Sequence, residues 1–169
     1  MSSSYERELK NILEAEQKTL NKVTTSLDTL AKNDYFRIKD KPFIVVRAAG
    51  SFGFDLVALR GDMSFLVEIK TSVFDTIHFS STDGKLQQQA DKMKQQCEKT
   101  KTLPIYAYRL KNHRGDSWRI FTFDIDGLEG RSRILHNHLP KLSTSSKGNF
   151  IMRWNEGLSL SDFINYLCR

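Results

Sequence analysis

The sequence contains only two cysteines, Cys97 and Cys168, and neither stands in a Cys-x-x-Cys or Cys/His pattern. This argues against a structural zinc site and against a disulfide framework, and it fits a reducing compartment. Long apolar runs are also missing, because no stretch is long enough to span a bilayer and the polar N-terminus carries no secretory signal. We therefore expect a cytoplasmic protein that does not enter a membrane.

The chain carries an excess of positive charge. Its 169 residues include 26 lysines and arginines against 20 aspartates and glutamates, which gives a net charge of +6. This charge is spread along the chain, which favours a basic face that attracts phosphates, although an ordinary soluble protein with a basic bias is the alternative. The length predicts a single domain, 1–169, with a core over about residues 4–125 and a C-terminal extension, 126–169, packed on that core.

The first forty residues are expected to be mainly helical. Apolar residues recur at three- and four-residue intervals from about Ser4 to Leu30, which indicates an amphipathic helix or two. Poor helix formers at 24–26 predict a break, with Ser26 capping a second piece that runs through Ala31. Residues 33–41 then look like a polar connection.

The middle of the chain predicts a sheet with a helix lying on it. Five β-rich runs are expected to be strands: 43–47, 54–60, 64–70, 103–110 and 118–123. The first three form an antiparallel meander, and a helix over 85–99 precedes the fourth strand, which is therefore expected to be parallel to the third. Beyond Asp124 we expect a short strand at 150–154 and a terminal helix at 161–167. The predicted class is α/β or α+β, with a central mixed sheet of about five strands flanked by helices.

Two carboxylates and a lysine occupy polar positions on otherwise apolar strands. Asp55 lies in the second run, and Glu68 and Lys70 follow thirteen and fifteen residues later in the third. Because side chains alternate along a strand, Glu68 and Lys70 project from the same face. Oxygen ligands for a hard divalent cation, with a positive group beside the attacking water, are what phosphodiester hydrolysis needs. The pattern predicts a metal-dependent nuclease site.

A purely structural interpretation of these residues is an ion pair across a solvated sheet edge, because short motifs often arise by chance. The apolar context favours the catalytic interpretation, since a buried charge is unfavourable without a partner and a metal ion would provide one. A Gly/Ser turn follows Arg47 and precedes Asp55. Its backbone N–H groups could hold a phosphate, and a plain turn is the alternative.

The chain resembles the archaeal Holliday-junction resolvases of the PD-(D/E)XK nuclease superfamily. Four segments carry the resemblance and occur in order: YEREL at 5–9, FIVVR at 43–47, AGSFGFD at 49–55 and VEIK at 67–70. They cover the N-terminal half, and their combination is more specific than any one of them. The resemblance implies a restriction-endonuclease-like nuclease core. It also implies a homodimer that cuts opposed strands of a four-way DNA junction, and so a nucleoid-associated location.

Carried over by position, the resemblance implies a catalytic set of four residues. Asp55 and Glu68 would bind Mg²⁺ or Mn²⁺, Glu6 would complete the metal site, and Lys70 would orient or help to deprotonate the attacking water. Without the resemblance, Glu6 is only an acidic residue in a first helical turn, where the helix dipole favours it.

The resemblance also implies DNA contacts. Arg7 and Arg47 match the basic residues near the scissile phosphate, and their alternative role is a surface ion pair. Ser51, in the Gly/Ser turn, is a weaker candidate for contacting the DNA backbone.

Two histidines, His136 and His138, might suggest zinc, but an isolated pair is more typical of a surface loop. The glutamines at 87–89 are expected on a solvated helix surface.

The sequence departs from the family pattern in three places. The segment Lys18 to Lys41 is longer than the corresponding segment of the family, and the C-terminal part is also longer. Residues 74–85 do not match the family pattern well. Substrate preference is therefore open to a second interpretation, in which the same metal site cuts linear or damaged duplex DNA in restriction or repair. A non-catalytic DNA-binding protein is a third, which the acidic groups oppose because they would repel phosphate.

Overall fold

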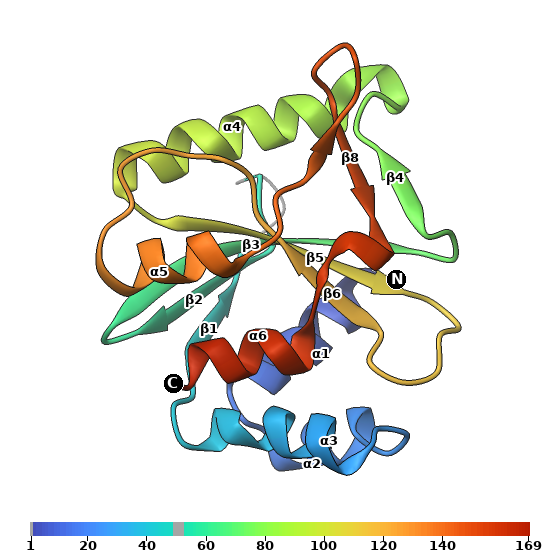
Figure 1. Ribbon diagram of the computed structural model, residues 1–169, viewed down its shortest axis with the longest axis vertical. Coiled ribbons are helices and arrows are strands. Elements are labelled where there is room, and N and C mark those ends of the chain that lie inside the picture. Colours follow the sequence, from blue (N-terminus) through green and yellow to red (C-terminus); the bar gives the residue numbers. More distant parts are fainter. Residues whose placement is uncertain (1, 49–52) are drawn as a thin grey trace.

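The computed structural model describes residues 2–48 and 53–169. Its centre is a six-stranded mixed sheet in the order β1-β2-β3-β5-β6-β9 (Figure 1). These strands are β1 (Ile44–Arg47), β2 (Leu56–Arg60), β3 (Met63–Ser72), β5 (Leu103–Leu110), β6 (Trp118–Phe121) and β9 (Leu158–Ser159). A smaller sheet has the order β4-β8-β7 and is formed by β4 (Thr76–His78), β8 (Phe150–Arg153) and β7 (Ser143–Thr144).

Helices cover both faces of the central sheet. They are α1 (Ser2–Leu13), α2 (Gln17–Val23), α3 (Thr29–Phe36), α4 (Lys85–Thr100), α5 (Gly130–His138) and α6 (Leu160–Leu167). Figure 1 shows α4 on one side of the sheet and α1, α3 and α6 on the other. Among the described residues, no helix is both long enough and apolar enough to cross a membrane.

The predicted strand arrangement is confirmed. β1, β2 and β3 form an antiparallel meander, and β5 joins β3 in parallel after α4 crosses over the sheet. This register places Glu68 beside Tyr106 on the neighbouring strand. The mixed sheet flanked by helices confirms the predicted fold class, although the central sheet has six strands rather than about five. The additional strand is β9, whose two residues pair with β6.

Strand alternation divides the apolar residues of β3 between two cores. Val67 and Ile69 belong to the core that contains α1 and α6, whereas Leu66 belongs to the core beneath α4. Because Glu68 and Lys70 alternate with Val67 and Ile69, their side chains lie on the α4 face. The sequence pattern thus decides on which side of the sheet the polar residues lie.

The prediction for residues 26–41 is wrong. Asp28, rather than Ser26, caps the second piece, with its Oδ1 accepting a hydrogen bond of 2.8 Å from Ala31 N. The helix continues to Phe36, and a 3₁₀ turn, Arg37–Lys39, follows where a polar connection was expected. The physical reason is that Tyr35 and Ile38 are buried in the α1-side core and anchor an otherwise polar stretch.

The C-terminal region is partly as predicted. The strand near 150–154 and the terminal helix near 161–167 are present as β8 and α6. α5 includes His136 and His138, for which a surface loop was expected, and β7 was not predicted. β4 and β8 pair although more than seventy residues separate them, and no local pattern indicates such a pairing.

Candidate active site

Asp55 lies just before β2 and is fixed through both its backbone and its side chain. Its N–H donates to Val67 O and its carbonyl accepts from Ala48 N, both at 2.8 Å. Its carboxylate Oδ2 accepts a hydrogen bond of 2.7 Å from Ile69 N. The Asp55 carboxylate also lies close enough to Glu68 to raise the pKa of that carboxyl group. The sheet therefore brings together the two predicted metal-binding carboxylates.

Glu68 is a buried carboxyl group with an incompletely satisfied oxygen. Its side chain is only 3% exposed, and among the described residues its Oε2 has no hydrogen-bond partner. The Lys70 ammonium lies 3.6 Å from that oxygen, which is an ionic contact without a hydrogen bond. Burial, with Asp55 nearby, raises the pKa of Glu68 to about 9, although Lys70 acts in the opposite direction. Without a ligand, this carboxyl group holds its proton more tightly than an ordinary glutamate does.

These two carboxyl groups fit a divalent cation. A buried carboxyl with an orphaned oxygen, beside a second carboxylate, is destabilising when both are ionised. A hard cation bound between Asp55 and Glu68 would offset that repulsion, and it would use the oxygen that lacks a hydrogen-bond partner within residues 2–48 and 53–169. Water and phosphate oxygens can complete the coordination of Mg²⁺ or Mn²⁺, as these ions commonly require.

Lys70 is held at the site by a glutamine from α4. Its Nζ donates a hydrogen bond of 3.2 Å to Gln89 Oε1 while it remains beside Glu68. This differs from the expectation that the glutamines lie on a solvated surface. Gln87 also has an interior contact, because its Oε1 accepts a hydrogen bond of 2.7 Å from Phe150 N. These contacts depend on how α4 is rotated about its axis against the sheet. Sequence periodicity alone does not determine that rotation.

Glu6 lies apart from the other two carboxylates. It extends from α1, which packs on the opposite face of the sheet from Glu68, and it forms an ion pair with Arg47 at 2.8 Å. The described residues contain no group of three or more histidines, cysteines, aspartates or glutamates placed to hold a metal ion. The role of Glu6 as a third metal ligand thus stays a prediction.

The predicted DNA-contacting residues have different surroundings. Arg47 is held by Glu6, with both Nε and Nη2 directed at its Oε2. Arg7 is exposed on α1 and lines an open cavity of about 330 Å³. Ser51 lies outside the described residues. The structure therefore places two basic side chains near the N-terminal helix and leaves their contacts with DNA as predictions.

Tyr106 is a site residue that the sequence did not indicate. It faces Glu68 in the parallel register, and its hydroxyl is buried without a hydrogen-bond partner among the described residues. Burial, followed by the negative charge of Glu68, raises its pKa well above the ordinary tyrosine value. Both of the unsatisfied buried side-chain atoms in the described structure thus belong to this neighbouring pair of residues. Only the strand register, and no local motif, could have identified Tyr106.

The two histidines have structural roles on α5 instead of lying in a surface loop. His136 is buried, and its Nε2 is hydrogen-bonded to Phe123 O at 2.9 Å. The ring of His138 stacks on Tyr166, with 4.6 Å between the ring centroids. These contacts account for both side chains without zinc.

The chain was compared with known protein families, curated proteins and solved structures. No family model matches the chain, and no curated protein matches it in sequence. Among solved structures, it is similar to Archaeoglobus fulgidus Hjc, a Holliday junction resolvase from an archaeal hyperthermophile. The identity is 17% and the TM-score 0.47, over 73% of this chain and 82% of that chain. At this level of similarity the comparison carries no functional argument.

Proposed function

We propose that the protein is a divalent-metal-dependent endodeoxyribonuclease that resolves four-way DNA junctions. The observation that carries this proposal is the buried Glu68 carboxyl, which lies beside Asp55 and Lys70 and whose Oε2 has no hydrogen-bond partner in the described part of the chain. A merely structural ion pair would be expected to complete its own hydrogen bonds. Perturbed titratable groups with a specific neighbour are typical of functional sites.

Asp55 and Glu68 are the residues that would hold Mg²⁺ or Mn²⁺. When bound, such an ion supplies a more acidic water molecule and neutralises negative charge at the phosphate. The Ile69 N–H orients the Asp55 carboxylate, so that this ligand is fixed in advance. Glu68 would bind the ion as the ionised carboxylate, because only that form is a strong ligand.

Lys70 supplies the second positive group. Gln89 holds its ammonium on the α4 face, where it can orient the attacking water and stabilise negative charge that develops on the phosphate. Preorganised charge of this kind lowers the barrier because the protein does not need to rearrange during the reaction. Lys70 is therefore assigned to transition-state stabilisation, and Gln89 is a positioning residue for it.

A branched substrate and a homodimer are supported by the resemblance of the four sequence segments to archaeal resolvases. Two copies of the site would make paired, symmetric nicks in opposed strands of a junction. The competing function is cleavage of linear or damaged duplex DNA by the same metal site. One fold can serve several substrates, so these two functions are distinguished only by comparing cleavage of the different DNA substrates.

The test compares cleavage of an immobile four-way junction with cleavage of a linear duplex of matching sequence, in Mg²⁺ or in EDTA. Wild type is expected to nick the junction symmetrically, and Asp55→Asn or EDTA is expected to abolish cutting. Asp40→Asn, at an exposed carboxylate outside the site, is the matched control and should cut normally. Equal cutting of the linear duplex would replace junction resolution by restriction or repair, while binding without any cutting would overturn the nuclease proposal.

A further inference from the structure

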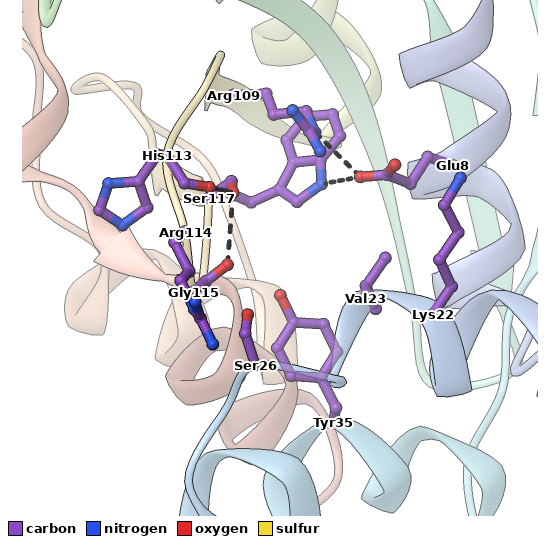
Figure 2. Close-up of a pocket in the computed structure, with 11 residues that line it drawn as sticks. Glu8, Lys22, Val23, Ser26, Tyr35, Arg109, His113, Arg114, Gly115 and Ser117 are labelled. Carbon is purple, nitrogen blue, oxygen red and sulfur yellow. Dashed lines mark hydrogen bonds and ion pairs between the residues drawn. The ribbon is translucent and has the colours of Figure 1, made fainter.

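A second basic region lies on the α1 face of the sheet, away from Glu68. It is a cavity of about 180 Å³ formed by α1, α2, α3 and the loop that joins β5 to β6 (Figure 2). Its basic side chains come from separate segments: Lys22 from α2, Arg109 from the end of β5, and Arg114 from the loop. Lys22 belongs to the segment that is longer than the family pattern.

The floor of this basic pocket is held by hydrogen bonds. Glu8 Oε1 accepts from Trp118 Nε1 at 2.9 Å and from Arg109 Nε at 3.0 Å. Figure 2 shows the contact between Glu8 and Arg109. Tyr35 lies at the lower edge, and its hydroxyl donates to Asp116 Oδ1 at 2.7 Å. Trp118 and Tyr35 are both buried. These contacts fix the shape of the pocket before any ligand arrives.

The rim of the pocket carries unneutralised positive charge. Lys22 and Arg114 are exposed, and neither side chain has an ion-pair or hydrogen-bond partner in the part of the chain that the structure describes. Arg109 is paired with Glu8, the one acidic residue that lines the pocket. Two positive charges are therefore left over, which is suited to an anionic ligand.

The positive region extends beyond this cavity. A neighbouring cavity of about 330 Å³ shares Glu8, Lys22 and Arg109 with it and adds Arg7 and Tyr5. The guanidinium of Arg109 lies 4.6 Å from the centroid of the Tyr5 ring, so that this aromatic face is covered by a cation. Several spaced cations along two open, adjoining cavities fit a chain of phosphates better than a single small anion. The Tyr5 ring, covered in this way, is not free for a base to stack on.

We propose that the basic pocket binds the phosphate backbone of a duplex DNA arm, away from the point of cleavage, with Lys22 and Arg114 as its main contacts. This inference rests on the proposed function, because it concerns the substrate of the same nuclease. It assigns a role to the longer N-terminal segment: α2 contributes a lysine to a DNA-binding surface. Phosphate contacts of this kind position the duplex without reading its sequence.

The test measures binding of a fluorescent four-way junction and of a linear duplex at several salt concentrations, in EDTA. The double variant Lys22→Ala/Arg114→Ala is compared with Lys18→Ala/Lys147→Ala, in which two exposed lysines outside both cavities are removed. Lys18 lies on the same helix as Lys22, and both variants lose two positive charges. Equal melting temperatures establish that each variant is folded.

The pocket variant is expected to lower the slope of log affinity against log salt by about 2, since each phosphate contact contributes roughly 0.9. The control variant should lower the slope by much less. Equal slopes and affinities for the two variants would overturn the basic-pocket proposal even if Mg²⁺-dependent cutting is intact. A reduced slope in the pocket variant, with no cutting by wild type, would support the pocket and overturn the nuclease function. Absence of DNA binding by wild type would overturn both.

Discussion

At the scale of single residues, the burial of Glu68 determines how the unliganded protein responds to pH. Its pKa in the folded protein is about 9, compared with 4.5 for an ordinary glutamate, mainly because burial disfavours the charged form. The folded state therefore binds a proton more tightly than the unfolded state does. Between these two values folding takes up a proton, so that stability decreases as the pH rises.

We expect Glu68→Gln to remove much of this pH dependence. In EDTA, the free energy of unfolding of wild type should fall as the pH rises from about 5 towards 9, by at most about 1.4 kcal/mol per unit. The glutamine variant should change much less over the same range, because it has no proton to lose. Urea unfolding at a series of pH values measures both curves, and parallel curves would contradict the prediction.

Tyr106 offers a second prediction at this scale. Tyr106→Phe removes a buried hydroxyl that lacks a partner among the described residues, so the unliganded protein should become more stable by about 1 kcal/mol. Tyr108→Phe is the matched control on the same strand, because the Tyr108 hydroxyl donates to Phe74 O. The control should lose about 1 kcal/mol in urea unfolding. A loss of similar size for Tyr106→Phe would reveal a partner for its hydroxyl.

The residues of the candidate site differ in how far sequence could identify them. Strand alternation predicted that Glu68 and Lys70 share one face, and Asp55 was selected as a polar residue at the start of an apolar strand. Gln89 and Tyr106 were not, since their positions depend on how α4 and β5 are aligned with β3. Local periodicity determines which face of the sheet a side chain lies on, whereas tertiary packing determines which other side chains it contacts.

At the scale of elements, α3 shows where sequence patterns are insufficient. The polar stretch after Ala31 resembles a loop, but Tyr35 and Ile38 provide the apolar anchors that keep it folded against the core. Two well-placed apolar residues are too few to produce a clear helical period. In contrast, α4 and the first three strands have regular apolar spacing over their whole length, and they were predicted to within a few residues.

The start of α3 can be tested directly. Asp28→Ala removes the side chain that caps the helix and should lower the free energy of unfolding by about 1 kcal/mol. Ser26→Ala should have little effect, because Ser26 lies outside the helix. Thermal or urea unfolding of the two variants distinguishes the two starting points. A larger decrease in the free energy of unfolding for Ser26→Ala than for Asp28→Ala would show that the helix begins after Ser26, as the sequence suggested.

At the scale of the whole molecule, a bound cation should stabilise the folded protein. A ligand that binds only the folded state adds about 2.7 kcal/mol at a concentration one hundred times its dissociation constant. We therefore expect Mg²⁺ or Mn²⁺ to raise the melting temperature of wild type relative to EDTA. Asp55→Asn should lose this rise, and Asp40→Asn should keep it. An equal rise in melting temperature for all three proteins would show that the ions bind away from Asp55.

The central sheet has a consequence for how this protein can be altered. Glu68 and Lys70 lie beneath α4, whereas Lys22, Arg109 and Arg114 belong to the opposite side. If both proposals hold, the layer of strands separates Asp55, Glu68 and Lys70 from the residues that bind the duplex arm. Exchanging α2 and the β5–β6 loop would then be expected to change the preferred substrate while leaving these three residues in place.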